Sequence, residues 1–205
     1  MTETLPTITI GGPDSLPTPV AAHAASRFVE AGVIVLKNLL PPDSVAVFND
    51  AYSRIYSGDI PSFRVNEVGD DRAMISLAIE NEFAAPDIFA NPVALSIVTE
   101  LLGEDFILGS YVAVTSQPGA AAQGDHADQI GLFEDVDLDT RVPPYSVTLV
   151  IPLVGLNETT GSTRFYPGTH ADPNVEDLTM IAPDAEPGDA ILFDSRILHG
   201  GQANR

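Results

Sequence analysis

The second half of the chain reads as a succession of short β-type runs. From Phe106 onward, apolar stretches rich in β-branched residues alternate with turns marked by Gly, Pro, Asn and Asp. Examples are FILGSYVAVTS, YSVTLVIPLVGL and DAILFDSRILHGG. Many short strands separated by such turns are typical of a β-sandwich or barrel. We therefore predict a mainly β core over about residues 105–205.

The first half has helical patterns instead. The predicted helices are 20–31, about 42–56 and 92–102, and the predicted strands are 33–36 and 73–80. Residues 1–19 are expected to be an irregular lead-in, because glycine and proline interrupt them. No linker or repeat separates the two halves. We therefore predict one domain over 1–205, with a helix-rich part over about 20–103 that flanks the β core.

Composition limits the chemistry that the chain can carry. The 205 residues include no cysteine, which excludes disulfides, iron–sulfur clusters and zinc–thiolate sites. A bound metal would need histidine and carboxylate ligands, which suit iron or manganese among others. The net charge of −20 and the nine scattered Lys and Arg argue against a nucleic-acid partner, which needs a basic surface.

No apolar run in the sequence approaches the roughly 18 residues that a membrane span needs. The N-terminal residues MTETLPTITIGGPDSLP also lack the basic start and apolar stretch of a signal peptide. We therefore expect a cytoplasmic protein without a membrane partner. The sequence leaves the oligomeric state open.

The tripeptide His-Ala-Asp occurs twice, at His126–Asp128 and at His170–Asp172, in a chain with four histidines. Side chains at i and i+2 of a strand share a face, so an imidazole and a carboxylate there can bind one ion. A further histidine would complete a set of two histidines and one carboxylate, which is typical of non-haem Fe(II) sites with open coordination positions. Taken alone, each copy is an equally good fragment of such a site.

The residues that flank the two copies predict different local structures. The second copy follows Pro167-Gly168-Thr169 and precedes Pro173, so it is predicted to lie in a loop where His170 and Asp172 need not share a face. The first copy follows a predicted strand and a Pro-Gly turn, and we expect His126 and Asp128 to lie on a strand themselves. His199 closes an apolar run and is followed by two glycines, which makes it a candidate third ligand. The remaining histidine, His23, is expected on a helix surface.

An ordered series of motifs extends over most of the chain. The series comprises Pro118-Gly119, His126-Ala127-Asp128, Gly161-Ser162-Thr163, Pro167-Gly168-Thr169-His170, Pro187-Gly188-Asp189, His199-Gly200-Gly201 and Asn204-Arg205. With this series and its spacing, the chain resembles the phytanoyl-CoA dioxygenase family of Fe(II)/2-oxoglutarate-dependent oxygenases. Each motif is weak alone, and their order gives the resemblance its specificity.

The resemblance implies a double-stranded β-helix, or jelly roll, with N-terminal helical segments. It implies that His126, Asp128 and His199 bind Fe(II), whereas His170 has a structural role in its turn. Gln123 and Thr163 are expected beside 2-oxoglutarate. The implied reaction consumes O2 and 2-oxoglutarate, hydroxylates a small-molecule metabolite, and releases succinate and CO2.

An arginine is also expected from the resemblance. Family members bind the distal carboxylate of 2-oxoglutarate with an arginine about ten residues after the distal histidine, and that position falls beyond Arg205. We therefore expect the natural chain to continue past Arg205, or another cation such as Arg164 to replace that arginine.

Several alternatives remain open. Asp128 occupies the position that a small residue takes in related halogenases, which favours hydroxylation, but desaturation, epoxidation and peroxide formation use the same ligands. A cupin-like metal enzyme that does not use 2-oxoglutarate is a second class, and a non-catalytic binding protein is a third. Segments 57–72 and 131–144 are expected to shape the substrate pocket.

Overall fold

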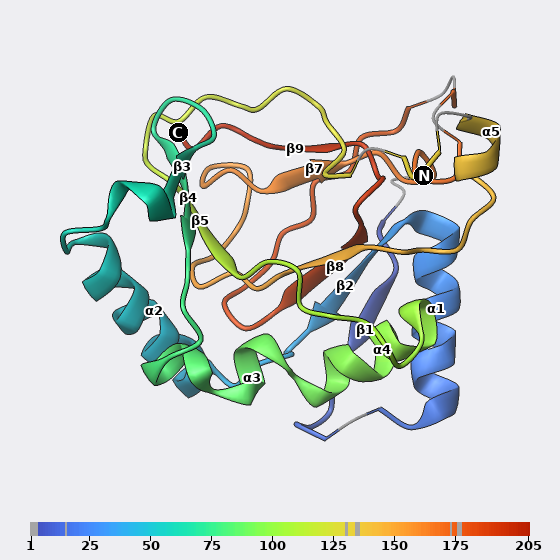
Figure 1. The fold of residues 1–205 in the computed structure, drawn as a ribbon, viewed down its shortest axis with the longest axis horizontal. Coiled ribbons are helices and arrows are strands. Elements are labelled where there is room, and N and C mark those ends of the chain that lie inside the picture. The colour runs from blue at the N-terminus through green and yellow to red at the C-terminus, as the bar shows by residue number, and fades with distance from the viewer. Residues whose placement is uncertain (1–3, 15, 130, 134–135, 173, 176–177) are drawn as a thin grey trace.

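The computed structural model describes residues 4–14, 16–129, 131–133, 136–172, 174–175 and 178–205. Three small sheets surround the centre of the molecule, and helices cover two of its sides (Figure 1). The predicted mainly β fold with flanking helices is confirmed at this level. Two of the sequence predictions include residues outside this description. These residues are Pro173, after the second His-Ala-Asp, and Glu134 and Asp135, within segment 131–144.

The largest sheet joins the two halves of the chain. Its strands are β1 (Thr7–Thr9), β2 (Val33–Lys37), β8 (Ala190–Asp194) and β6 (Val147–Val150), in the order β1-β2-β8-β6. β2 is parallel to β1 and antiparallel to β8, which in turn is antiparallel to β6. The expectation that residues 1–19 are irregular is therefore wrong for Thr7–Thr9, a three-residue strand too short to stand out by periodicity.

Helices α1 (Thr18–Ala31) and α4 (Pro92–Leu102) cover one face of this sheet (Figure 1). Their apolar stripes, with Phe28 and Ile97 fully buried, pack against Ile34 and Leu192 of the sheet. The Asn91 side chain begins α4 by accepting hydrogen bonds from the first free backbone N–H groups. Both helices are confirmed close to their predicted bounds.

The second sheet lies beside helix α2 (Pro42–Tyr56), the third predicted helix (Figure 1). Its strands are β3 (Val65–Glu67), β4 (Arg72–Ser76) and β5 (Val112–Ser116), in that order. Tyr52 of α2 shares a 2.6 Å hydrogen bond with Thr115 of β5. The short helices η1 (Ser62–Arg64), η2 (Asn81–Ala84), α3 (Pro86–Phe89) and α5 (Val136–Asp139) lie in the connections.

The run DAILFDSRILHGG is two strands rather than one. β8 ends at Asp194, and β9 (His199–Gly201) pairs with β7 (Thr163–Phe165) in a separate two-stranded sheet. The Asp194 side chain accepts a hydrogen bond from the backbone N–H of Arg196, and the Asp194 carbonyl accepts one from Ile197. This side-chain-stabilised turn moves the chain from one sheet to the other, so His199 does not close β8 as its sequence suggested.

The turn that holds His170 packs against the end of α1. His170 is buried, and its Nε2 lies 2.9 Å from the carbonyl oxygen of Val29. Gly32, the residue after the helix, has a left-handed backbone with φ of 78°, and a Cβ there would overlap the His170 ring at Nδ1. His170 therefore stabilises the junction between α1 and β2.

We expect Gly32→Ala to reduce the free energy of unfolding by about 1–3 kcal/mol more than Gly119→Ala does, because only the first substitution overpacks a buried ring. Gly119 is the matched control, since its φ of 98° imposes a comparable backbone strain while nothing lies within 4 Å of its added Cβ. Urea denaturation of both variants measures the difference. Equal losses would show that His170 does not constrain this junction.

Candidate metal centre

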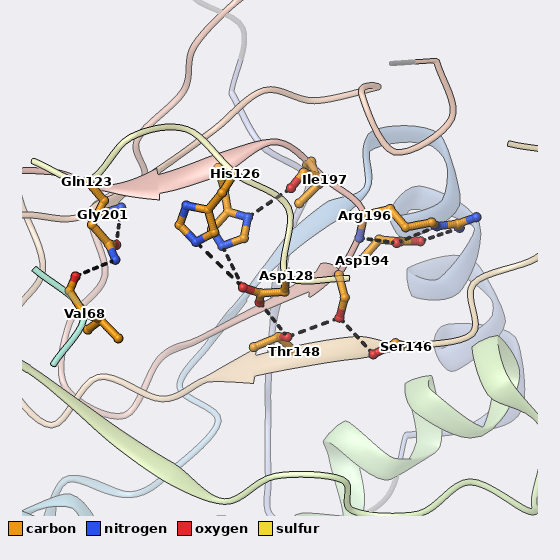
Figure 2. Close-up of polar contacts among 12 residues, drawn as sticks. Val68, Gln123, His126, Asp128, Ser146, Thr148, Asp194, Arg196, Ile197 and Gly201 are labelled. Carbon is orange, nitrogen blue, oxygen red and sulfur yellow. Dashed lines mark hydrogen bonds and ion pairs between the residues drawn. The ribbon is translucent and has the colours of Figure 1, made fainter. Parts of the chain in front are cut away.

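His126, Asp128 and His199 come together in space. Figure 2 shows the imidazole of His126 beside the carboxylate of Asp128. One potential ligand atom from each side chain lies within 4.8 Å of the others. Asp128 Oδ1 is 3.8 Å from His126 Nε2 and 3.5 Å from His199 Nε2. The structure thus brings together the three residues that the sequence singled out, and it keeps His170 apart from them at the end of α1.

The backbone places the two histidines opposite each other, although they are 73 residues apart in the sequence. The N–H of His126 donates to the carbonyl of His199 at 2.8 Å, and the reverse hydrogen bond is 2.9 Å. The centroids of the two imidazole rings lie 4.6 Å apart. This reciprocal pair of bonds is a single antiparallel bridge, so the two imidazoles project from adjoining segments.

The prediction that His126 and Asp128 lie on a strand is wrong. Apart from the bridge at His126, this segment has irregular backbone. The chain bends after Asp128 because the N–H of Gln129 donates to the carbonyl of Ser195 at 3.0 Å. The carboxylate therefore reaches the imidazoles through this bend, which the turn after β8 stabilises, and not through strand alternation.

Hydrogen bonds to the backbone orient both imidazoles. His126 Nδ1 lies 3.0 Å from the carbonyl oxygen of Gly124, and His199 Nδ1 lies 3.0 Å from that of Ile197. A carbonyl only accepts, so each neutral ring carries its proton on Nδ1 and presents an Nε2 lone pair to Asp128. Three electron-rich atoms that converge in this way fit a bound cation, and the nitrogen and oxygen donors suit a divalent transition metal.

The site is buried on the side of His199 and open on the other. The side chain of His199 is 7% exposed, whereas those of Asp128 and His126 are 36% and 42% exposed. Burial lowers the pKa of His199, although the Asp128 carboxylate opposes this shift. The depressed pKa favours the neutral imidazole, which is the form that binds metal.

Gln123 and Arg72 lie beside the three residues, in a cleft of about 580 Å3 that His126 also lines. The Gln123 Oε1 accepts a 3.0 Å hydrogen bond from the N–H of Gly201, and its Nε2 lies 3.4 Å from the carbonyl oxygen of Val68 (Figure 2). These contacts hold the amide between β9 and the segment after β3. Gln123 therefore belongs to the same site as the candidate metal ligands.

Arg72 is a buried cation that sequence reasoning missed. Its Nη2 donates to the carbonyl of Gln202 at 2.8 Å, and its Nε donates to Ser116 Oγ at 3.2 Å. Burial and the nearby positive charge of Arg164 lower its pKa. Among the described residues, no carboxylate lies within ion-pair distance of Arg72. A desolvated guanidinium without a counter-ion favours the binding of an anion.

Thr163 lies on the same face of the β7–β9 sheet as His199. In the β7–β9 pair Thr163 is opposite Gly201 and Phe165 is opposite His199, so the two-residue alternation puts all four positions on one face. A Cβ on Gly201 would lie 2.8 Å from Gln123 Oε1. The structure thus places both predicted 2-oxoglutarate contacts, Gln123 and Thr163, toward one region.

Neither Arg164 nor Arg205 lines the cleft, although Arg164 contacts the backbone beside it. The Nε of Arg164 donates to Asp125 at 2.6 Å, and its Nη2 donates to the carbonyl of Gln123. Arg205 is exposed and lies 3.8 Å from Glu158. Arg164 therefore supports the backbone around Gln123, whereas Arg72 is the described arginine that lines the cleft.

Two histidines and one carboxylate at the edge of a β-rich scaffold define the class of non-haem metal enzymes. The sequence profile of the phytanoyl-CoA dioxygenase (PhyH) family matches residues 28–205. The chain belongs to this family, and the resemblance inferred from its motifs is confirmed.

Relatives agree with the assignment. The dioxygenase trt7 of Aspergillus terreus is 28% identical over 92% of this chain and 70% of its own length. The Fe(II)/2-oxoglutarate-dependent dioxygenase nvfF of Aspergillus novofumigatus is 24% identical over 86% of the chain and 64% of its own length. The chain thus spans about two thirds of these relatives. The expected enzyme class, with Fe(II) and 2-oxoglutarate as its cofactors, is confirmed by this kinship.

A solved structure shows the same fold. The crystal structure of SnoK, a non-haem alpha-ketoglutarate-dependent carbocyclase from nogalamycin biosynthesis, superposes with a TM-score of 0.70 over 95% of this chain and 82% of its own length. The two sequences are 18% identical, so this likeness concerns the fold. Within the described residues, no helix combines the length and apolar character that a membrane span requires.

Proposed function

We propose that the protein hydroxylates a small organic molecule with Fe(II), O2 and 2-oxoglutarate, releasing succinate and CO2. The observation that carries this proposal is the convergence of His126, Asp128 and His199 beside a cleft with a buried arginine that forms no ion pair with any described carboxylate. His126, Asp128 and His199 would hold the metal, which supplies the oxidative chemistry when it is bound.

The proposed co-substrate residues are Gln123, Thr163 and Arg72. 2-Oxoglutarate carries two carboxylates, and the guanidinium fork of Arg72 matches a carboxylate in charge and shape. The amide of Gln123 is fixed at both ends, so it would contact the ligand without having to become ordered first. Arg72 was not predicted from the sequence, and we propose it as the cation that binds a carboxylate of 2-oxoglutarate.

The substrate is proposed to be a small molecule with apolar surface. Alternation along β4 and β5 puts Met74 and Val114 on the same face of the sheet as Arg72, while Ile75 and Thr115 face α2. Val114 is 58% exposed on that face, which leaves apolar surface for a ligand. The Aspergillus dioxygenases among the relatives, and the structural neighbour SnoK from nogalamycin biosynthesis, support a small-molecule substrate.

Four wider predictions belong to the same proposal. The sheet β1-β2-β8-β6 and the pair β7–β9 would be the two walls of a jelly roll, since Phe165 and Phe193 pack between them at a ring distance of 5.2 Å. Residues 1–205 would form a single oxygenase domain. The net charge of −20 supports the absence of a nucleic-acid partner, and the cytoplasmic location stays a prediction.

The proposal is tested by adding Fe(II) and then 2-oxoglutarate without oxygen and recording the visible charge-transfer band of the chelate. We expect Arg72→Met to weaken 2-oxoglutarate binding about 10- to 100-fold, because a charge-assisted hydrogen bond contributes about 1.5–3 kcal/mol. Arg205→Met is the control, since Arg205 is 72% exposed. Its titration is expected to match the unmodified protein.

Other outcomes would replace the proposal. Metal binding without the band would indicate a metal enzyme that does not use 2-oxoglutarate, such as a cupin-like one. A protein that binds no metal would be a non-catalytic binding protein. A normal titration of Arg72→Met would remove Arg72 from the co-substrate site.

A further inference from the structure

We propose that Thr148 is a positioning residue that sets the orientation of the Asp128 carboxylate. The inference rests on the proposed function, because it concerns Asp128 as a metal ligand. Thr148 lies on β6, and its hydroxyl donates to Asp128 Oδ2 at 3.3 Å (Figure 2). No motif in the sequence pointed to this residue.

The two oxygens of Asp128 have different surroundings. Oδ1 faces the Nε2 atoms of His126 and His199, whereas Oδ2 accepts the hydrogen bond from Thr148. A carboxylate whose second oxygen is hydrogen-bonded is held for coordination through one oxygen. A freely rotating carboxylate would also bind through both oxygens and occupy a position that co-substrate or O2 needs.

Two serines fix the direction of the Thr148 hydroxyl. Thr148 Oγ1 lies 3.4 Å from Ser195 Oγ, which lies 3.0 Å from Ser146 Oγ. A hydroxyl donates only one hydrogen bond, so the Thr148 proton directed at Asp128 leaves Thr148 able only to accept from Ser195. One consistent arrangement therefore runs from Ser146 through Ser195 and Thr148 to the carboxylate, and each donor strengthens the next.

The backbone keeps this chain of hydroxyls in place. Thr148 is opposite Phe193 in the β6–β8 ladder, and the N–H of Ser195 donates to the carbonyl of Ser146 at 3.1 Å. The carbonyl of Ser195 also accepts a hydrogen bond from the N–H of Gln129, the residue after Asp128. The turn that contains Ser195 leads into β9, the strand that carries His199. The hydroxyl chain and two of the three candidate ligands are therefore attached to one turn.

The proposal is tested by titration with Mn(II), in which electron paramagnetic resonance measures the free ion. Four proteins are compared, namely the unmodified protein and three variants. Thr148→Val keeps the β-branched shape on a strand and removes the hydroxyl, and we expect about tenfold weaker Mn(II) binding. Thr148→Ser restores the hydroxyl and should restore the affinity. Thr115→Val is the matched control, because it removes a hydroxyl on β5 that shares a 2.6 Å hydrogen bond with Tyr52 of α2.

A second readout is the charge-transfer band of the Fe(II)–2-oxoglutarate chelate. We expect this band to shift in Thr148→Val and to keep its position in Thr115→Val, since only the first change alters a group that contacts a ligand. Equal Mn(II) affinity in Thr148→Val and the unmodified protein would overturn the role of Thr148, and so would an equal loss in Thr115→Val. Failure of the unmodified protein to bind Mn(II) would overturn the proposed function as well.

Discussion

His199→Ala is expected to weaken Mn(II) or Fe(II) binding by more than about 100-fold and to abolish the charge-transfer band with 2-oxoglutarate. A residue that only orients a ligand contributes about 10- to 100-fold to metal affinity, so the loss of a ligand should exceed that range. His199 is the most buried of the three candidate ligands and is fixed by Ile197 and by its bridge to His126. Water is poorly placed to substitute for its Nε2.

His170→Ala is the control for this experiment. His170 is similarly buried and belongs to the second His-Ala-Asp copy, but it lies against α1 and not in the site. We expect this variant to lose stability and keep its metal affinity, which separates damage to the core from loss of a ligand. A band that survives His199→Ala and disappears in His170→Ala would reverse the assignment of the two copies.

Asp194→Ala is expected to reduce the free energy of unfolding by about 3–5 kcal/mol, the usual cost of breaking a buried ion pair. The Asp194 side chain is fully buried and receives two hydrogen bonds from the Arg196 guanidinium, at 2.9 and 2.7 Å. Arg196 also donates to the carbonyls of Asp139 and Val142 and lies over the ring of Tyr145. Without Asp194, this buried cation would lose the carboxylate that binds it directly.

An exposed ion pair provides the comparison. Glu30 pairs with Arg27 on α1, and both side chains are about half exposed. Glu30→Ala should therefore change the free energy of unfolding by no more than about 1 kcal/mol in the same urea titration. Similar effects of the two substitutions would contradict a structural role for the pair of Asp194 and Arg196.

The predictions that succeeded rest on local pattern or on an ordered series of motifs. Amphipathic periodicity and terminal glycine predicted α1 and α4, and proline in the first turn marked the start of α2. The spacing of the motifs singled out His126, Asp128 and His199 before their proximity was known. Their role as ligands stays a prediction that the titrations above test.

The predictions that failed concern long-range contacts and short polar turns. Arg72 reaches the site because β4 packs near the end of β9, more than a hundred residues later, and no local pattern encodes that proximity. Asp194, Ser195 and Arg196 look like a short polar interruption of an apolar run, but their hydrogen bonds divide β8 from β9. The bend at Asp128 depends on the same turn.

The position of β2 between β1 and β8 has a consequence for how the protein is made. β2 belongs to the first 40 residues, and its partner β8 ends at Asp194, so the central sheet cannot close until nearly all of this sequence has left the ribosome. The bridge between His126 and His199 forms later still. A growing chain therefore lacks the complete set of candidate ligands, and an ion bound by all three would stabilise only the finished fold.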